Sequence, residues 1–92
     1  MRGNRVMTKA DEIPFEIEAR WNPGDYAWCE VMRSWLCITP NGLLGNLGAH
    51  TVEEHEDGTI TVSPSILVSL PHEGEPTKTY HGYLRRGEWS EA

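Results

Sequence analysis

Short runs of β-favouring residues, separated by turn-forming residues, recur along most of this chain. Residues 50–55 and 59–62 flank an Asp57-Gly58 pair, and this arrangement predicts a β-hairpin. We expect a type I′ turn at its tip, because an Asp-Gly pair suits two central positions of positive φ. Residues 66–70 form another apolar run, which predicts a further strand.

A second hairpin is predicted at the C-terminal end of the sequence. Residues 77–84 and 88–90 are β-favouring, and they flank an Arg-Arg-Gly turn at residues 85–87. Residues 71–76 contain two prolines and a glycine, so they predict a loop between the strand at 66–70 and this hairpin.

Two segments in the first half of the chain carry different patterns. Phe15 and Ile17 alternate with polar residues, which predicts a short strand over residues 13–17, and Pro14 places that strand at a sheet edge. Residues 27–37 fit two short strands or one bulged strand by their period-two spacing. The same residues also fit the i, i+3, i+4, i+7 spacing of a helix, so both interpretations stay open.

These elements together predict a mainly β protein. We expect a small single antiparallel sheet, or a partly open barrel of short hairpins, with room for one short helix. The 92 residues suffice for one domain with a thin core. We place a flexible N-terminal segment at residues 1–12 and the single β-rich domain at residues 13–92.

Composition and charge narrow the functional classes. The net charge is −6, and residues 1–20 carry four basic and four acidic residues, so the whole excess lies in residues 21–92. Phosphate binding needs a basic face, so we expect no direct contact with nucleic acid and none with anionic membranes. The two cysteines form no disulfide framework, and the sequence has no apolar run of membrane-spanning length. We therefore expect a cytosolic protein with reduced thiols.

The candidate chemistry favours binding over catalysis. No nucleophile elbow, phosphate-binding loop or regular zinc-finger spacing is present, so we expect no enzyme. Aromatic residues dominate protein interfaces, and several gather near one loop and near the C-terminus. Carboxylates bracket the predicted hairpin tip, where a solvated acidic surface is the ordinary interpretation. The candidate protein-binding residues are Trp21, Tyr26, Trp28, Glu53, Glu54, Glu56, Asp57, Tyr83 and Trp89.

A resemblance to a known family bears on the origin of the protein. Two motifs carry it: the first is His55-Glu56-Asp57-Gly58-Thr59-Ile60-Thr61-Val62-Ser63-Pro64-Ser65-Ile66, and the second is His81-Gly82-Tyr83-Leu84-Arg85-Arg86-Gly87-Glu88-Trp89. On these motifs, residues 35–89 resemble a family of small uncharacterised bacteriophage and prophage proteins that share a domain of unknown function. The resemblance implies a phage or prophage origin and assigns no activity.

Many members of that family carry four Cys and His residues that look like a zinc site. In this sequence residues 37–42 hold a single cysteine and residues 78–81 lack theirs, so Cys37 and His81 are the two matching positions. The resemblance therefore implies a degenerate site. We expect no cofactor, with aromatic packing in place of the metal, and keep zinc at Cys37 and His81 as the alternative.

The sequence thus leads to one preferred function and three alternatives. We expect a phage-encoded, non-enzymatic accessory protein that binds a host or phage protein in the host cytoplasm. The alternatives are a small capsid decoration protein of the virion, an acidic inhibitor that mimics DNA through the predicted hairpin tip, and a zinc-binding domain. The oligomeric state stays open.

Overall fold

A computed structural model describes residues 1–72 and 75–92, and the side chains of residues 1–70 and 77–92. Strands contain 49% of the residues and helix 8%, so the mainly β prediction is confirmed. The elements in chain order are β1 (Asn4–Arg5), α1 (Pro14–Arg20), β2 (Asp25–Cys29), β3 (Ser34–Ile38), β4 (Leu44–Asn46), β5 (Thr51–Glu54), β6 (Ile60–Ser63), β7 (Ile66–His72), β8 (Glu75–Arg85) and β9 (Glu88–Glu91).

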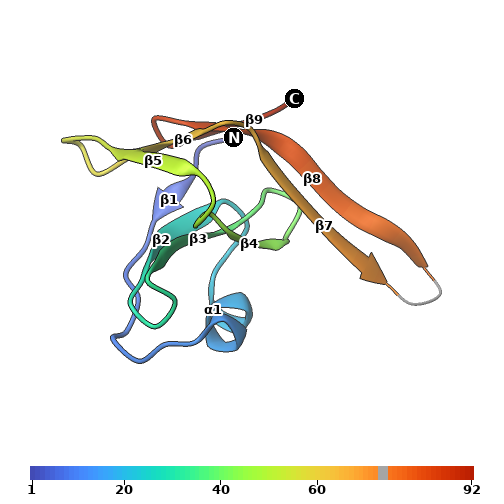
Figure 1. Ribbon diagram of the computed structural model, residues 1–92, viewed down its shortest axis with the longest axis horizontal. Helices are drawn as coiled ribbons and strands as arrows, with labels where there is room; N and C mark the ends of the chain where they lie inside the picture. Colours follow the sequence, from blue (N-terminus) through green and yellow to red (C-terminus); the bar gives the residue numbers. More distant parts are fainter. Residues whose placement is uncertain (73–74) are drawn as a thin grey trace.

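The described strands are divided among three small sheets (Figure 1). The first has the order β1-β2-β3-β4, the second pairs β5 with β6, and the third has the order β7-β8-β9. All described pairs are antiparallel except β1 with β2, which is parallel. The described strands form no closed barrel. Figure 1 shows β7 and β8 extending together as a long arm away from the other two sheets.

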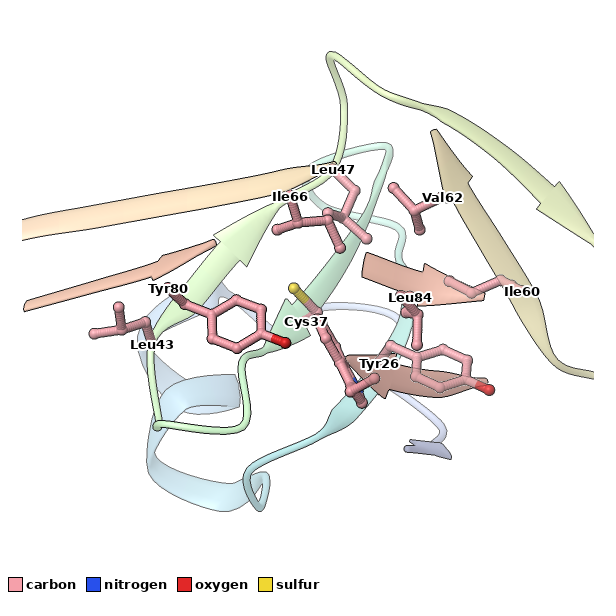
Figure 2. Close-up of a cluster of buried hydrophobic side chains, with 10 residues drawn as sticks. Tyr26, Cys37, Leu43, Leu47, Ile60, Val62, Ile66, Tyr80 and Leu84 are labelled. Carbon is pink, nitrogen blue, oxygen red and sulfur yellow. The ribbon is translucent and has the colours of Figure 1, made fainter. Parts of the chain in front are cut away.

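The main core lies where the three sheets meet (Figure 2). Alternation along the strands explains it, because successive side chains of a strand point to opposite faces. In β8, for example, Tyr80 and Leu84 are buried while His81 is exposed. The buried members of this core are Tyr26, Cys37, Leu43, Leu47, Ile60, Val62, Ile66, Tyr80, Leu84 and Trp89.

A second, smaller core lies on the opposite face of the β2–β3 pair. Tyr26 and Cys37 belong to the main core, whereas their chain neighbours Ala27 and Leu36 belong to the second one. The second core is completed by Ile17 of α1, which is fully buried. The β2–β3 pair is therefore covered on both faces, and α1 forms one of the covers.

The structure corrects the predicted edge strand at residues 13–17, because this segment begins α1. Proline is favoured in the first turn of a helix, where its missing N–H costs nothing, and Pro14 occupies that position. The Glu16 carboxylate accepts a hydrogen bond from the Ile13 N–H at 3.2 Å, which satisfies one free donor of the first turn. Phe15 is 79% exposed while Ile17 is buried, so their alternation reflected one buried residue rather than a pleated strand.

Residues 27–29 lie in β2, residues 34–37 lie in β3, and residues 30–33 form the turn between them, which settles the choice between strand and helix. Trp28 pairs with Trp35, and Cys29 with Ser34, in an antiparallel hairpin. Val31 and Met32, which the helical spacing counted as apolar-face residues, are exposed in the turn, whereas Leu36 and Cys37 are buried on opposite faces of the sheet. The turn brings Arg33 to a φ of 48°, in the left-handed region.

Both predicted hairpins are present, and the first turn differs from the expected type. Among residues 56–58 only Gly58 has positive φ, at 87°, and the His55 N–H donates to the Thr59 carbonyl at 2.8 Å. This is a three-residue loop with glycine in the left-handed position, so the type I′ prediction is wrong. The predicted loop at 71–76 is shorter than expected, since β7 runs to His72 and β8 starts at Glu75; residues 73 and 74 lie outside the described residues.

The first residues of the chain have partners within the fold. β1 pairs with β2, and the Gly3 N–H donates to the Gly87 carbonyl at 2.7 Å. The N-terminal ammonium of Met1 donates to the Trp89 carbonyl at 3.0 Å. These contacts attach residues 1–6 to two of the sheets. The flexibility expected for residues 1–12 stays a prediction.

Candidate functional site

The acidic hairpin tip lies at the end of the β5–β6 pair and is mostly exposed. Asp57 accepts hydrogen bonds from the Thr59 hydroxyl at 2.6 Å and from the Thr59 N–H at 3.0 Å. The hydroxyl hydrogen bond is the main cause that lowers the pKa of Asp57, so this carboxylate stays charged. His55 is held between Thr61, at 2.7 Å from Nε2, and Glu53, at 3.5 Å from Nδ1.

Arg5 of β1 joins this tip to the first sheet. Its guanidinium donates to the Glu54 carboxylate and, at 3.2 Å, to the Gly58 carbonyl. The same guanidinium lies 5.0 Å above the Trp35 ring, within the range of a cation–π interaction. Trp35 in turn contacts Trp28 edge-to-face, with ring centroids 6.1 Å apart and an interplanar angle of 75°. Arg5 thus connects an acidic loop to an aromatic pair.

A groove of about 350 Å³ runs beside Trp28, between β2 and the segment that follows β1. The Thr8 hydroxyl donates to the Trp28 carbonyl at 2.7 Å and holds this segment against the strand. The Trp28 ring is 37% exposed, and its Nε1 donates to Glu30 at 3.1 Å. Met7 is 83% exposed at the same groove. The lining residues are Arg5, Val6, Met7, Thr8, Ala10, Trp28 and Glu30.

A second shallow groove, of about 380 Å³, lies on the other side of β1, toward the hairpin tip. Arg5 and Met7 line both grooves, and Asp57 lines the second. The two grooves and the acidic tip are therefore continuous across β1. We call this continuous region the Arg5 surface, and its central residues are Arg5, Met7, Trp28, Glu54 and Asp57.

The structure brings together only some of the predicted binding residues. Trp28 and the four carboxylates of the tip belong to or adjoin the Arg5 surface. Trp21, Tyr26 and Trp89 are 7%, 1% and 3% exposed, so they are core residues. Tyr83 lies elsewhere, with the Arg85 guanidinium 4.0 Å above its ring.

Sequence reasoning missed Arg5, Met7 and Trp35. Arg5 and Met7 fall in the segment that we expected to be flexible, and no local pattern marks their contacts. The Arg5–Glu54 pair joins positions 49 residues apart in the chain. Trp35 could have been included, because an alternating strand assignment for residues 27–37 places it opposite Trp28.

The two positions matched to the zinc site do not meet. Cys37 is fully buried in the main core, and burial raises the pKa of its thiol to about 12. His81 is exposed on β8, next to the inward-facing Tyr80, and its Nε2 lies 3.1 Å from the Ser65 hydroxyl. In the part of the chain that the structure describes, no three His, Cys, Asp or Glu side chains converge as metal ligands would.

Comparisons with known proteins assign no family or function to the chain. No family model matches the chain, and no significant match was found among curated proteins or solved structures. No helix within the described residues is long and apolar enough to cross a membrane.

Proposed function

We propose that this protein is a non-enzymatic, phage-encoded accessory protein that binds a host or phage protein through the Arg5 surface. The observation that supports this most is the position of Arg5, which contacts both the Glu54 carboxylate and the Trp35 ring. An apolar groove and an acidic tip thereby form one surface. The phage origin, and with it an encounter in the host cytoplasm, rests on the sequence resemblance of residues 35–89.

The groove side of the surface suits an apolar anchor from the partner. Tryptophan, methionine and arginine are enriched in protein interfaces, and partly buried tryptophans are frequent hot spots. Trp28 offers a ring already fixed by its contact with Trp35, so little freedom is lost on binding. Met7 is flexible and exposed, and can adapt to the anchor's shape.

The tip side of the surface sets the charge of the partner. Arg5 already engages Glu54, while Glu53, Glu56 and Asp57 present their carboxylates to solvent. With the net charge of −6, this arrangement attracts cationic groups and repels acidic ones. The partner we propose is therefore a protein segment with an apolar side chain followed by lysine or arginine residues.

A peptide-display library panned against the full chain tests the proposal. We expect enrichment of peptides that combine an apolar residue with nearby lysine or arginine, and weaker binding at higher salt. Met7→Glu should reduce the affinity of the enriched peptides at least tenfold, because it places a charge in the groove. Phe15→Glu is the matched control: Phe15 is 79% exposed on α1, outside the groove, and should leave affinity unchanged.

The outcomes separate the proposal from its acidic alternative. Equal binding of the enriched peptides by wild type and Met7→Glu, or no enrichment, would refute the groove as the docking site. A DNA-mimic inhibitor would instead use the acidic tip alone. Its binding would fall with Glu53→Gln and Glu56→Gln together, and would be indifferent to Met7→Glu.

A further inference from the structure

β7 is an edge strand of the three-stranded sheet. It pairs with β8 on one side, and no other described strand pairs with its opposite edge. The arm formed by β7 and β8 extends away from the rest of the molecule in Figure 1. This edge is independent of the Arg5 surface, which lies on β1, β2 and the β5–β6 tip.

The register of the arm shows which backbone groups face the open edge. On β8, the Thr79 carbonyl accepts a hydrogen bond from Asn41 Nδ2 at 3.0 Å, and the His81 carbonyl accepts one from the Ala92 N–H at 3.0 Å. Both carbonyls therefore point away from β7. In an antiparallel pair, residues alternate between positions that bond to the partner strand and positions that bond outward.

On β7, the backbone N–H and C=O groups of the residues opposite Thr79 and His81 must point away from β8. Leu67 is paired with His81 and Ser69 with Thr79, so the N–H and C=O groups of Leu67 and Ser69 face the open edge. Ser65, two residues earlier, shows the same orientation, since its carbonyl lies 3.1 Å from His50 Nε2. His50 thus covers the edge at Ser65. The outward groups of Leu67 and Ser69 have no partner among the described residues.

The edge from Ile66 to Leu70 lacks the usual protection, which begins only at Pro71 and at the register shift between Leu70 and His72. Exposed edge strands normally carry charges or prolines that prevent pairing with another chain. These five residues are uncharged in a chain in which 24% of residues are charged, and Leu67 is 62% exposed. The outer edge of β8 differs, because Asn41 contacts it at Thr79 and the Ala92 N–H contacts it at His81.

We infer that the open edge of β7 pairs antiparallel with β7 of a second copy of this chain, about a two-fold axis at Val68. In this register, Leu67 of one copy lies opposite Ser69 of the other, and the two residues donate a backbone hydrogen bond to each other. The two-fold axis repeats this pair, so four backbone hydrogen bonds join the two strands. Val68 lies opposite Val68 of the second copy, in the non-hydrogen-bonded position between them. The two sheets then form one continuous sheet across the dimer.

The side chains favour a second copy over a different partner. In the antiparallel dimer, Ile66 of one copy lies opposite Leu70 of the other, Leu67 lies opposite Ser69, and the two Val68 residues lie opposite each other. On the face that carries Val68, which also packs against the main core of its own copy, apolar residues therefore meet apolar residues across the two strands, with no charge to satisfy. Each copy has a net charge of −6, so the two copies repel each other. Higher salt should strengthen this association by screening that repulsion.

Sedimentation equilibrium of the full chain over a range of concentrations tests the dimer. The contact is small, so we expect a dissociation constant of roughly micromolar order. Ser69→Pro removes an outward N–H and no bond to β8, so the monomer should fold while the dimer weakens at least tenfold. Leu67→Lys should weaken it similarly. Thr77→Lys, which adds the same charge on β8 of the same arm, should leave the dimer unchanged.

Cysteine cross-linking tests the register. Val68→Cys should form an intermolecular disulfide under mild oxidation, because the two residues face each other at roughly 4.5 Å between Cα atoms. Leu70→Cys is the control, since it lies opposite Ile66 and four residues from its own equivalent. A wild type that stays monomeric at all concentrations, or a dimer unaffected by Ser69→Pro and Leu67→Lys, would overturn the inference. Cross-linking at residue 70 in place of 68 would overturn the proposed register.

Discussion

Replacing the buried carboxylate of Glu12 tests how the segment before α1 is held to the domain. Glu12 is 2% exposed and accepts hydrogen bonds from Arg20 Nε at 2.8 Å, from Arg20 Nη2 at 2.7 Å and from the Lys9 N–H at 3.1 Å. In Glu12→Gln, one carboxylate oxygen becomes an amide NH₂ that faces a donor. At least one charge-assisted hydrogen bond is therefore lost.

The magnitude follows from that count. Hydrogen bonds to charged groups contribute about 1.5–3 kcal/mol each, and Arg20 is 45% exposed, which places the loss near the lower end, at about 2 kcal/mol. For a chain of this size that loss corresponds to a Tm lower by roughly 8–16 °C. Urea unfolding followed by tryptophan fluorescence gives the free energy. Glu18→Gln is the control, because it removes the same charge from an exposed position of α1.

The pH dependence provides a second readout. The hydrogen bonds from Arg20 are the main cause that lowers the pKa of Glu12 below its ordinary value of 4.5. A carboxylate whose pKa is lower in the folded chain than in the unfolded chain stabilises the fold at any pH above its unfolded-state pKa. This stabilisation is lost as the pH falls through its folded-state pKa. The difference between wild type and Glu12→Gln should therefore be largest near neutral pH and shrink below pH 4.5. If Glu12→Gln and Glu18→Gln were equally stable at pH 7, desolvation would cancel the ion pair and the reasoning would be refuted.

Two further predictions concern the main core. Leu84→Ala should lower the free energy of unfolding by about 2–5 kcal/mol, because Leu84 is fully buried, whereas Phe15→Ala at a 79% exposed position should change it little; equal losses in urea titrations would contradict the assigned core. Cys37 should resist alkylation at pH 8, because burial raises the pKa of its thiol to about 12 and leaves almost no thiolate. Peptide mapping by mass spectrometry should find it modified only when urea unfolds the chain, and rapid modification of the native protein would contradict this burial.

The parts of the fold that follow from local chemistry were predictable from the sequence. Gly58 fixed the position of the first hairpin and Gly87 that of the last, because both have the positive φ that a tight turn needs. Even so, the turn type at Gly58 depends on the number of unpaired residues between the two strands, and the Asp-Gly pair alone does not specify that number. The helix α1 was missed because its clearest feature, a buried Ile17, depends on packing against β2 and β3.

The candidate site was less predictable, because its central contacts are not local. Trp28 was expected as a binding residue from its type, and it is the partly exposed tryptophan of the groove. Trp21 and Trp89 were expected on the same grounds and are buried, since a small domain needs large side chains to fill its core. Composition cannot distinguish these uses. The role of Arg5 depends on β1 pairing in parallel with β2, which nothing in residues 1–12 indicates.

The two proposed surfaces have a joint consequence that can be measured. A dimer through β7 would present two Arg5 surfaces, and a support densely coated with an enriched peptide would engage both at once. The apparent affinity should then exceed the single-site affinity by about 10²–10⁴ when the spacing allows double engagement. Ser69→Pro should lose this gain and keep the affinity for free peptide, whereas Met7→Glu should lose both and still dimerise. Higher salt should weaken peptide binding, because it screens the attraction at the acidic tip, and should strengthen dimerisation, because it screens the repulsion between the two copies. A Ser69→Pro variant that binds the dense support as tightly as wild type would show that the two surfaces are not linked through this dimer.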